Sequence, residues 1–438
     1  MLSTSETPTT GRIRVLVVAP YMHHLGHTAT FPHDMALAFA ANEADVTLAC
    51  PLAPVPSVNS TAQDIRRWAL ELEIKACSSM AQRLWGRLIH RPFLQCVVWL
   101  IFAQRAKDFD VVFFTDSEPA SRESIWYLQL ARLCGPIRAP IAFAEHFPYA
   151  WNANRLGRLL RADRLRLRGM LMLSFSRTLL ESNRHVMRWP EAGCYVPWGV
   201  WPQPMSDYDR ACARQRLGIS PDARVLLVFG MLSIRRKEID TLAHAVKSLE
   251  PGRQLTVLFA GTRTCDADHP FDDAELRSKR HLTIRRVESF IDEAEVATYF
   301  AAADGIWAYY GVFGGASGVL LQAIGFGRLA ITSDSGEIGE LSRRHGVGLS
   351  VGVDNPAELR TKLSAFVDMS PAEQARHERQ ARDAASSLAW PFIGRAVLDS
   401  CLGRTTGLVQ ATASQGVSAD LSLNRGSEPE GRHASHTD

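Results

Sequence analysis

The strongest constraint on the fold is a strand-then-helix pattern that runs along the chain twice. Residues 12–20 read RIRVLVVAP, a charged start followed by an almost unbroken apolar run. Such a run is typical of a parallel strand covered on both faces. The pattern restarts at residues 223–230, which contain RVLLVFG. We therefore predict an α/β protein with two doubly wound, Rossmann-like domains that face each other across a cleft.

Apolar periodicity places the other elements of this prediction. In the first half we expect a polar loop after the first strand, a helix near residues 35–41, and strands at 45–50, 111–114, 141–145, 170–175 and 194–197. In the second half we expect helices at 239–249 and 294–303, with strands at 254–261, 282–284, 305–308 and 329–332. Ligands of such folds bind beyond the carboxyl ends of the strands.

Composition narrows the class of protein. The net charge of +3 is too small to indicate nucleic acid, and the eight cysteines include no CxxC pair and no metal-ligand spacing. The first residues are polar and lack an apolar signal core. No apolar run approaches the ~20 residues that span a bilayer. These features predict a cytoplasmic protein.

A glycine-rich segment at residues 309–340 reads as loop, helix, strand and a second glycine turn at 334–336. Ser317 is the expected N-cap of the helix, and Gly325 and Gly327 end it. A loop without side chains that opens a helix presents free N–H groups and the positive end of the dipole, which suits a phosphate. An ordinary connection, whose glycines serve only the turn, explains the loop equally well.

Several segments, in this order, resemble a GT-B glycosyltransferase of the GT4-like group, the glycosyl transferases group 1. They are CYVPWGV at 194–200, FGMLSIRRKEIDTLAHA at 229–245, VESFIDEAEVATYFAAADGIWAYY at 287–310, ASGVLLQAIGFGRLAITSDSGEIGEL at 316–341 and SLAWPFIGRAVLDSCL at 387–402. The last resembles the terminal helix that crosses back to the first domain. The resemblance implies an acceptor domain 12–198, a donor domain 199–386 and a crossover helix 387–402. The polar composition of the two ends predicts a disordered N-terminus 1–11 and a disordered tail 403–438.

The resemblance implies transfer of a sugar from a nucleotide-diphospho-sugar, with retention, to a lipid-linked sugar, a polysaccharide or another glycan. It implies no cofactor and no metal. The diphosphate leaving group needs cations and backbone amides, which Arg236, Lys237 and the amides of residues 315–318 would supply. Without the resemblance, the basic residues 235–237 are a solvated helix start, although cations at a helix N-terminus oppose its dipole.

The resemblance also assigns the site residue by residue. His146 would reach the donor sugar near the reacting carbon, and Gly26 and His27 would lie where the acceptor approaches. Four histidines between residues 23 and 33 match no metal template. The donor-binding residues it implies are Gly230, Gly261, Gly314, Gly315, Ser317, Gly318, Val319 and Gln322.

The chain departs from the family where most members carry two glutamates eight positions apart. Those positions fall on Gly314 and Gln322, so both carboxylates are absent. Glu238 stands where a glycine usually follows the basic pair. Two interpretations follow: a divergent subgroup of enzymes that orients its donor differently, or a GT-B protein that has lost transfer and binds a sugar nucleotide or a glycan. The basic pair, the Ser-Gly loop and His146 favour the enzyme.

Two basic stretches in the expected acceptor domain are candidates for binding to a membrane surface. Six arginines crowd residues 154–169 between leucines, and residues 78–91 form a second amphipathic candidate. Such segments bind an anionic membrane, which predicts peripheral contact on its inner face. Surface helices that bury leucine against the core account for each stretch alone. No aromatic interleaving indicates nucleic acid.

Overall fold

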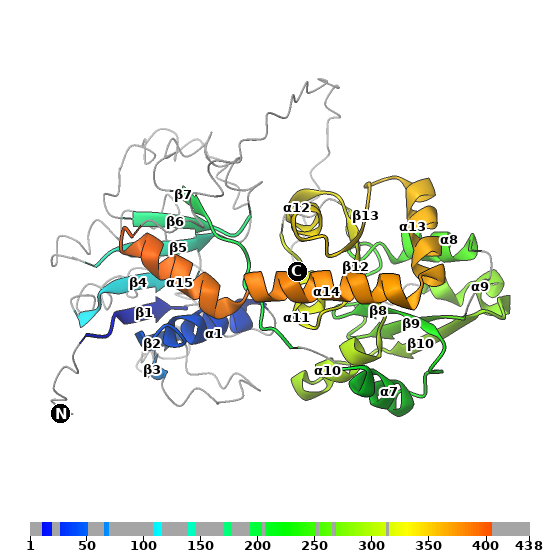
Figure 1. Ribbon diagram of the computed structural model, residues 1–438, viewed down its shortest axis with the longest axis horizontal. Helices are drawn as coiled ribbons and strands as arrows, with labels where there is room; N and C mark the ends of the chain where they lie inside the picture. Colours follow the sequence, from blue (N-terminus) through cyan, green and yellow to red (C-terminus); the bar gives the residue numbers. More distant parts are fainter. Residues whose placement is uncertain are drawn as a thin grey trace, which may run out of the picture.

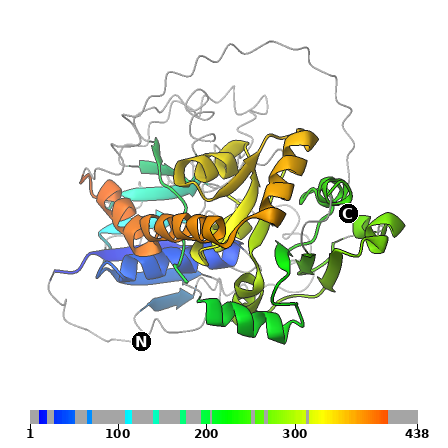
Figure 2. The ribbon, with the colours of Figure 1, turned by 45° about the vertical axis from the view of Figure 1, so that its right-hand side comes forward.

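The computed structural model describes residues 11–19, 27–50, 65–69, 108–115, 139–145, 170–176, 193–203, 206–249, 254–264, 269–311 and 315–404. Two parallel β-sheets, each with its own helices, lie one after the other along the long axis (Figure 1). Helices α14 (Pro371–Ser387) and α15 (Trp390–Cys401) run from the second sheet to the first in both views (Figures 1 and 2). The predicted GT-B architecture, with its returning C-terminal helix, is confirmed.

The first sheet has seven parallel strands in the order β3-β2-β1-β4-β5-β6-β7. Helix α1 (His27–Ala40) packs on β1 and β2. Its core includes the contact between Phe31 and Phe175, whose ring centroids are 5.2 Å apart. The strands are β1 (Arg14–Val18), β2 (Asp45–Cys50), β3 (Arg66–Ala69), β4 (Val111–Phe114), β5 (Ile141–Glu145), β6 (Met170–Ser174) and β7 (Gly193–Tyr195).

The second sheet has six parallel strands in the order β10-β9-β8-β11-β12-β13. The order reverses between β8 (Arg224–Phe229) and β11 (Gly305–Ala308), which makes their carboxyl ends the topological switch point. The other strands are β9 (Leu255–Ala260), β10 (Leu282–Val287), β12 (Leu329–Ser333) and β13 (Gly348–Val351). The remaining helices are α7 (Asp207–Arg216), α8 (Ile239–Lys247), η5 (Pro270–Asp272), α9 (Ala274–Ser278), α10 (Glu293–Ala302), α11 (Gly318–Gly325), α12 (Gly336–His345) and α13 (Pro356–Asp368).

One local prediction is wrong. We expected a loop at His27 and a helix near residues 35–41, but α1 begins at His27 and includes Pro32. Phe31 lies on the same buried face as Met35 and Phe39. Burying that extra aromatic side chain outweighs the backbone hydrogen bond that a proline inside a helix removes.

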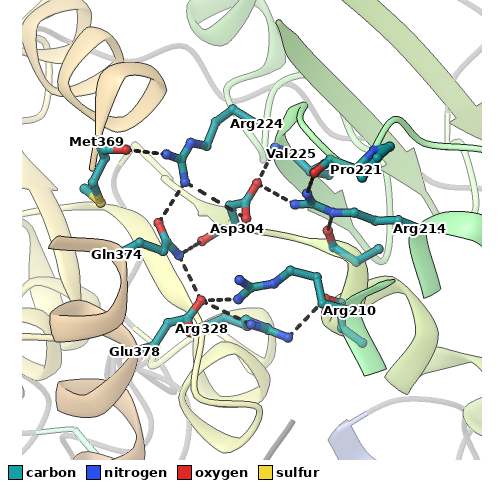
Figure 3. A network of polar contacts seen from close by, with 12 residues as sticks. Arg210, Arg214, Pro221, Arg224, Val225, Asp304, Arg328, Met369, Gln374 and Glu378 are labelled. Carbon is teal, nitrogen blue, oxygen red and sulfur yellow. Dashed lines mark hydrogen bonds and ion pairs between the residues drawn. The ribbon is translucent and has the colours of Figure 1, made fainter. Parts of the chain in front are cut away.

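A network of buried ion pairs ties the amino edge of the second sheet to α7 and α14 (Figure 3). Asp304, just before β11, accepts from the Val225 N–H at 2.8 Å and from Arg214 at 2.7 Å. Glu378 of α14 accepts from Arg328 at 3.2 Å and also from Arg210. Burial lowers the pKa of Arg328 to about 10, so it stays cationic at neutral pH. Each of these charges lies in an ion pair, which indicates a structural role.

The chain passes from the first domain to the second near Val200 and returns between α14 and α15. These two segments are hydrogen-bonded to each other. The Val200 N–H donates to Leu388 O at 2.8 Å, and the Trp390 N–H donates to Val200 O at 3.0 Å. A Cβ on Gly199 would lie 2.2 Å from the Trp390 ring, so only glycine fits there. Trp390 in turn packs on Phe31 of α1, with ring centroids 5.9 Å apart. The linker and the returning chain therefore form one junction.

A carboxyl group lies at this junction. Asp34 of α1 accepts a hydrogen bond from Trp201 Nε1 of the linker at 2.7 Å. Burial, reinforced by the negative charge of Glu293 in the second domain, raises the pKa of Asp34 to about 7 although the Trp201 bond opposes that shift. The folded state therefore binds this proton more tightly than the unfolded chain does. The stability that this proton contributes is full below about pH 4 and is lost as the pH rises through 7.

Asp34→Asn keeps an oxygen acceptor for Trp201 and removes the ionisable group. We expect the variant to gain stability relative to wild type as the pH rises from 5 to 8, by ~2 kcal/mol over that range. Chemical unfolding at each pH measures the difference. Asp368→Asn, at an exposed carboxylate on α13, is the control and should show no such trend. A difference between Asp34→Asn and wild type that does not change with pH would contradict this account.

Candidate active site

Three loops meet at the carboxyl edge of the second sheet, next to the switch point. Gly230 follows β8 and Gly261 follows β9, with φ values of 90° and 141° that favour glycine. A Cβ on Gly261 would lie 1.8 Å from Gly230 O. A Cβ on Gly230 would lie 3.9 Å from Val319 Cγ2, on the helix that follows β11. The glycines let the backbones of the first two loops approach closely, beside the start of α11.

Lys237 supplies a buried cation at this edge. Its side chain is almost fully buried, and Nζ donates to the Tyr310 hydroxyl at 3.4 Å and lies 5.4 Å from the centre of the Tyr310 ring. Within the described ranges, no carboxylate forms an ion pair with Lys237. Trp307 Nε1 donates to Lys237 O at 2.7 Å, which fixes the loop to the core. An ammonium held in this way is poised to attract an anion.

Ser317 joins this cation to the start of α11. Its hydroxyl donates to the Tyr310 hydroxyl at 2.9 Å and accepts from the Leu320 N–H at 3.4 Å. The predicted N-cap is therefore confirmed. Gly318, the first residue of α11, is exposed, and an added Cβ there would meet nothing within 4 Å. The N-terminus of α11 thus lies beside the buried ammonium.

The structure brings some of the expected site residues together. Gly230, Gly261 and Val319 converge, and Lys237 and Ser317 meet through Tyr310. Gly315, half-buried, opens the described part of the loop before Ser317. Arg236 adjoins Lys237 with an exposed side chain, and Gln322 is exposed on α11.

Other expected residues cannot be placed. His146, Gly26 and Gly314 lie outside the described residues, and for His27 the structure describes only the backbone that opens α1. Both basic stretches of the first domain also lie outside them. Within the described ranges, no three His, Cys, Asp or Glu side chains are grouped to hold a metal ion, and no helix is long and apolar enough to cross a membrane.

Sequence reasoning missed two contacts around this edge. Tyr310, which links Lys237 to Ser317, appeared only as the end of a motif. Tyr195 at the end of β7 donates to the buried carboxylate of Glu337 at 2.8 Å, which joins the first sheet to the first turn of α12. A period-2 or period-3.6 pattern carries no signal for such contacts, because they join residues far apart in the chain.

A family model described as glycosyl transferases group 1 matches residues 223–368, from β8 to the end of α13. The second domain is therefore similar to the glycosyl transferases group 1. No curated protein sequence matches the chain.

Solved structures of low sequence identity share the fold of this chain. A glycosyltransferase from Rickettsia africae is 13% identical with a TM-score of 0.65, covering 90% of this chain and 100% of its own. HepE (Alr3699) of Anabaena, in complex with UDP and glucose, is 14% identical with a TM-score of 0.62 over 90% and 100% of the two chains. Sucrose-phosphate synthase from Thermosynechococcus elongatus is 17% identical with a TM-score of 0.57 over 92% and 100%.

Gly261→Ala tests the close approach of the two glycine loops. Gly218 provides a matched control, because its φ of 61° is also positive but the nearest atom to an added Cβ is 3.6 Å away. We expect Gly218→Ala to cost ~1 kcal/mol of unfolding free energy from backbone strain alone. Gly261→Ala adds a backbone clash and should cost at least ~3 kcal/mol. Thermal and chemical unfolding measure both; equal costs would contradict the geometry.

Proposed function

We propose that this protein is a glycosyltransferase that transfers a sugar from a nucleoside-diphospho-sugar to a glycan acceptor, with retention of configuration and without a metal ion. One observation carries the proposal: the buried ammonium of Lys237 beside the N-terminus of α11. The second domain would hold the donor. The first domain would hold the acceptor near Gly26 and His27, and its His146 would reach the donor sugar near the reacting carbon.

The physical argument starts from the leaving group. When the bond between sugar and diphosphate breaks, negative charge develops on the diphosphate oxygen. A buried ammonium and the N–H groups that open α11 would stabilise that charge in a place already shielded from water. Arg236, next to Lys237, would add a planar fork for a second phosphate oxygen. Because cations supply this stabilisation, the reaction needs no bound metal.

The similar structures support this choice of donor. HepE has been determined with UDP-glucose as well as with UDP and glucose, so a protein of this fold binds a sugar nucleotide. WaaG, with a TM-score of 0.55 over 89% of this chain, is involved in lipopolysaccharide biosynthesis. By analogy we propose a lipid-linked or polysaccharide acceptor, approached from the inner face of a membrane. Salt-sensitive binding to anionic vesicles would support that surface.

A second function is favoured by one sequence feature. Gly314 and Gln322 stand where most members of the family carry glutamates. A protein that keeps the diphosphate site but has lost transfer would bind a sugar nucleotide without consuming it. An assay of donor hydrolysis without acceptor separates the two functions, with release of nucleoside diphosphate as the readout. An enzyme should release it slowly, and a binding protein should release none.

The test of the diphosphate site compares two lysines of helix α8 and the turn before it. Calorimetry with UDP, GDP and ADP, without added metal, identifies the nucleotide that binds wild type. We expect Lys237→Met to weaken that binding about a hundredfold, since a charge-assisted hydrogen bond contributes up to ~3 kcal/mol. Without nucleotide the variant should melt no lower than wild type, because it removes a buried, uncompensated charge.

Lys247→Met is the control. Lys247 lies in the last turn of α8 and pairs with Asp273 at 2.6 Å, so its loss should leave nucleotide affinity unchanged. Arg236→Ala should weaken binding as well, by about tenfold, because its side chain is exposed to water. Wild-type affinity in Lys237→Met would show that the diphosphate lies elsewhere.

A further inference from the structure

Glu238 has a backbone conformation that its side chain disfavours. Its φ and ψ are 49° and 43°, the left-handed region, where glycine suffers no steric penalty and a glutamate does. It occupies the N-cap position of α8 but makes no capping hydrogen bond through its side chain. The backbone therefore gives no reason for a glutamate here, and any benefit must come from the carboxylate.

The carboxylate of Glu238 lies against the loop that leads from β11 to α11. Oε2 accepts from Thr241 Oγ1 at 2.9 Å, which orients the group. Oε1 lies 2.8 Å from the place that a Cβ on Gly311 would occupy, so an alanine there would push the carboxylate aside. Among the described residues, no group donates a hydrogen bond to Oε1. One carboxylate oxygen is thus fixed, and the other faces the loop after β11 with capacity to accept.

Lys237 and Glu238 are neighbours in the sequence and carry opposite charges. Their side chains reach two neighbouring residues of the loop after β11. Lys237 directs its ammonium to Tyr310, and Glu238 directs its carboxylate to Gly311. A carboxylate repels a diphosphate, so the ligand part that meets Glu238 is neutral and donates hydrogen bonds. The hydroxyl groups of a sugar joined to the diphosphate have that chemistry.

We propose that Glu238 is a specificity-determining residue that accepts hydrogen bonds from hydroxyl groups of the transferred sugar, while Lys237 holds the diphosphate. The proposal rests on the proposed function and adds the residue that distinguishes a sugar nucleotide from the bare nucleotide. It places a carboxylate for the sugar on the loop after β8, in a chain whose donor loop carries glycine at position 314.

The experiment measures two affinities for each variant by calorimetry: UDP and UDP-glucose, or GDP and GDP-mannose if wild type prefers guanine. For Glu238→Gly we expect unchanged affinity for the diphosphate and about tenfold weaker binding of the sugar conjugate, the loss of one hydrogen bond to a charged group. Glu238→Gln keeps a neutral acceptor and should lose less. Glu238→Gly should melt no lower than wild type, because glycine relieves the backbone strain.

Two further variants separate this role from simpler ones. Gly311→Ala displaces the carboxylate without removing it and should show the same selective loss for the sugar conjugate. Asp240→Asn removes another carboxylate from the first turn of α8, and it should change neither affinity.

Equal weakening of both ligands by Glu238→Gly would assign Glu238 to the helix N-terminus and overturn the inference, as would no weakening of either. Failure of wild type to bind any nucleoside diphosphate would overturn the proposed function and this inference together. Normal diphosphate binding with no selective effect of Glu238 would overturn the inference alone.

Discussion

The site depends on one constraint: the ammonium of Lys237 is buried at the switch point of a parallel sheet. Among the described residues, no carboxylate forms an ion pair with it. Burying an uncompensated charge costs free energy, and the core fixes this one through the bond from Trp307 to the Lys237 carbonyl. The surrounding features follow from that requirement. Tyr310 and Ser317 connect the ammonium to the start of α11, and Gly230 and Gly261 let the neighbouring loops approach closely.

Charged side chains are paired at the amino edge of the second sheet, whereas at its carboxyl edge Lys237 and Glu238 do not pair with each other. At the amino edge, buried arginines are matched by Asp304 and Glu378, and the network holds β11, α7 and α14 in place. Such matched pairs contribute rigidity and leave little affinity for a ligand. At the carboxyl edge, the ammonium and the Glu238 carboxylate point to neighbouring residues of one loop and do not pair with each other. Separately, the bonds of Val200 with Leu388 and Trp390 join the two segments of chain that run between the domains.

The sequence predicted what local patterns determine. Strand β2 (Asp45–Cys50) and strand β11 (Gly305–Ala308) have the predicted limits, because unbroken apolar runs between turns leave little choice. Strand β3 was missed, since its sequence RRWA has no apolar alternation. The sequence pointed to Lys237 and Glu238 but not to the burial of the first or the direction of the second. Those depend on Tyr310 and Gly311, more than 70 residues further along the chain.

Hydrogen exchange with and without UDP tests the central claim most directly, because UDP is bound in a structure of this fold. The account predicts slower exchange of the amides at residues 315–319 and 230–238, where a diphosphate would meet the start of α11 and the Lys237 turn. Amides around Asp304 and Arg328, at the opposite edge of the sheet, should not change. If the nucleotide binds and the amides at 315–319 exchange as before, the diphosphate does not sit at this helix and the account is wrong.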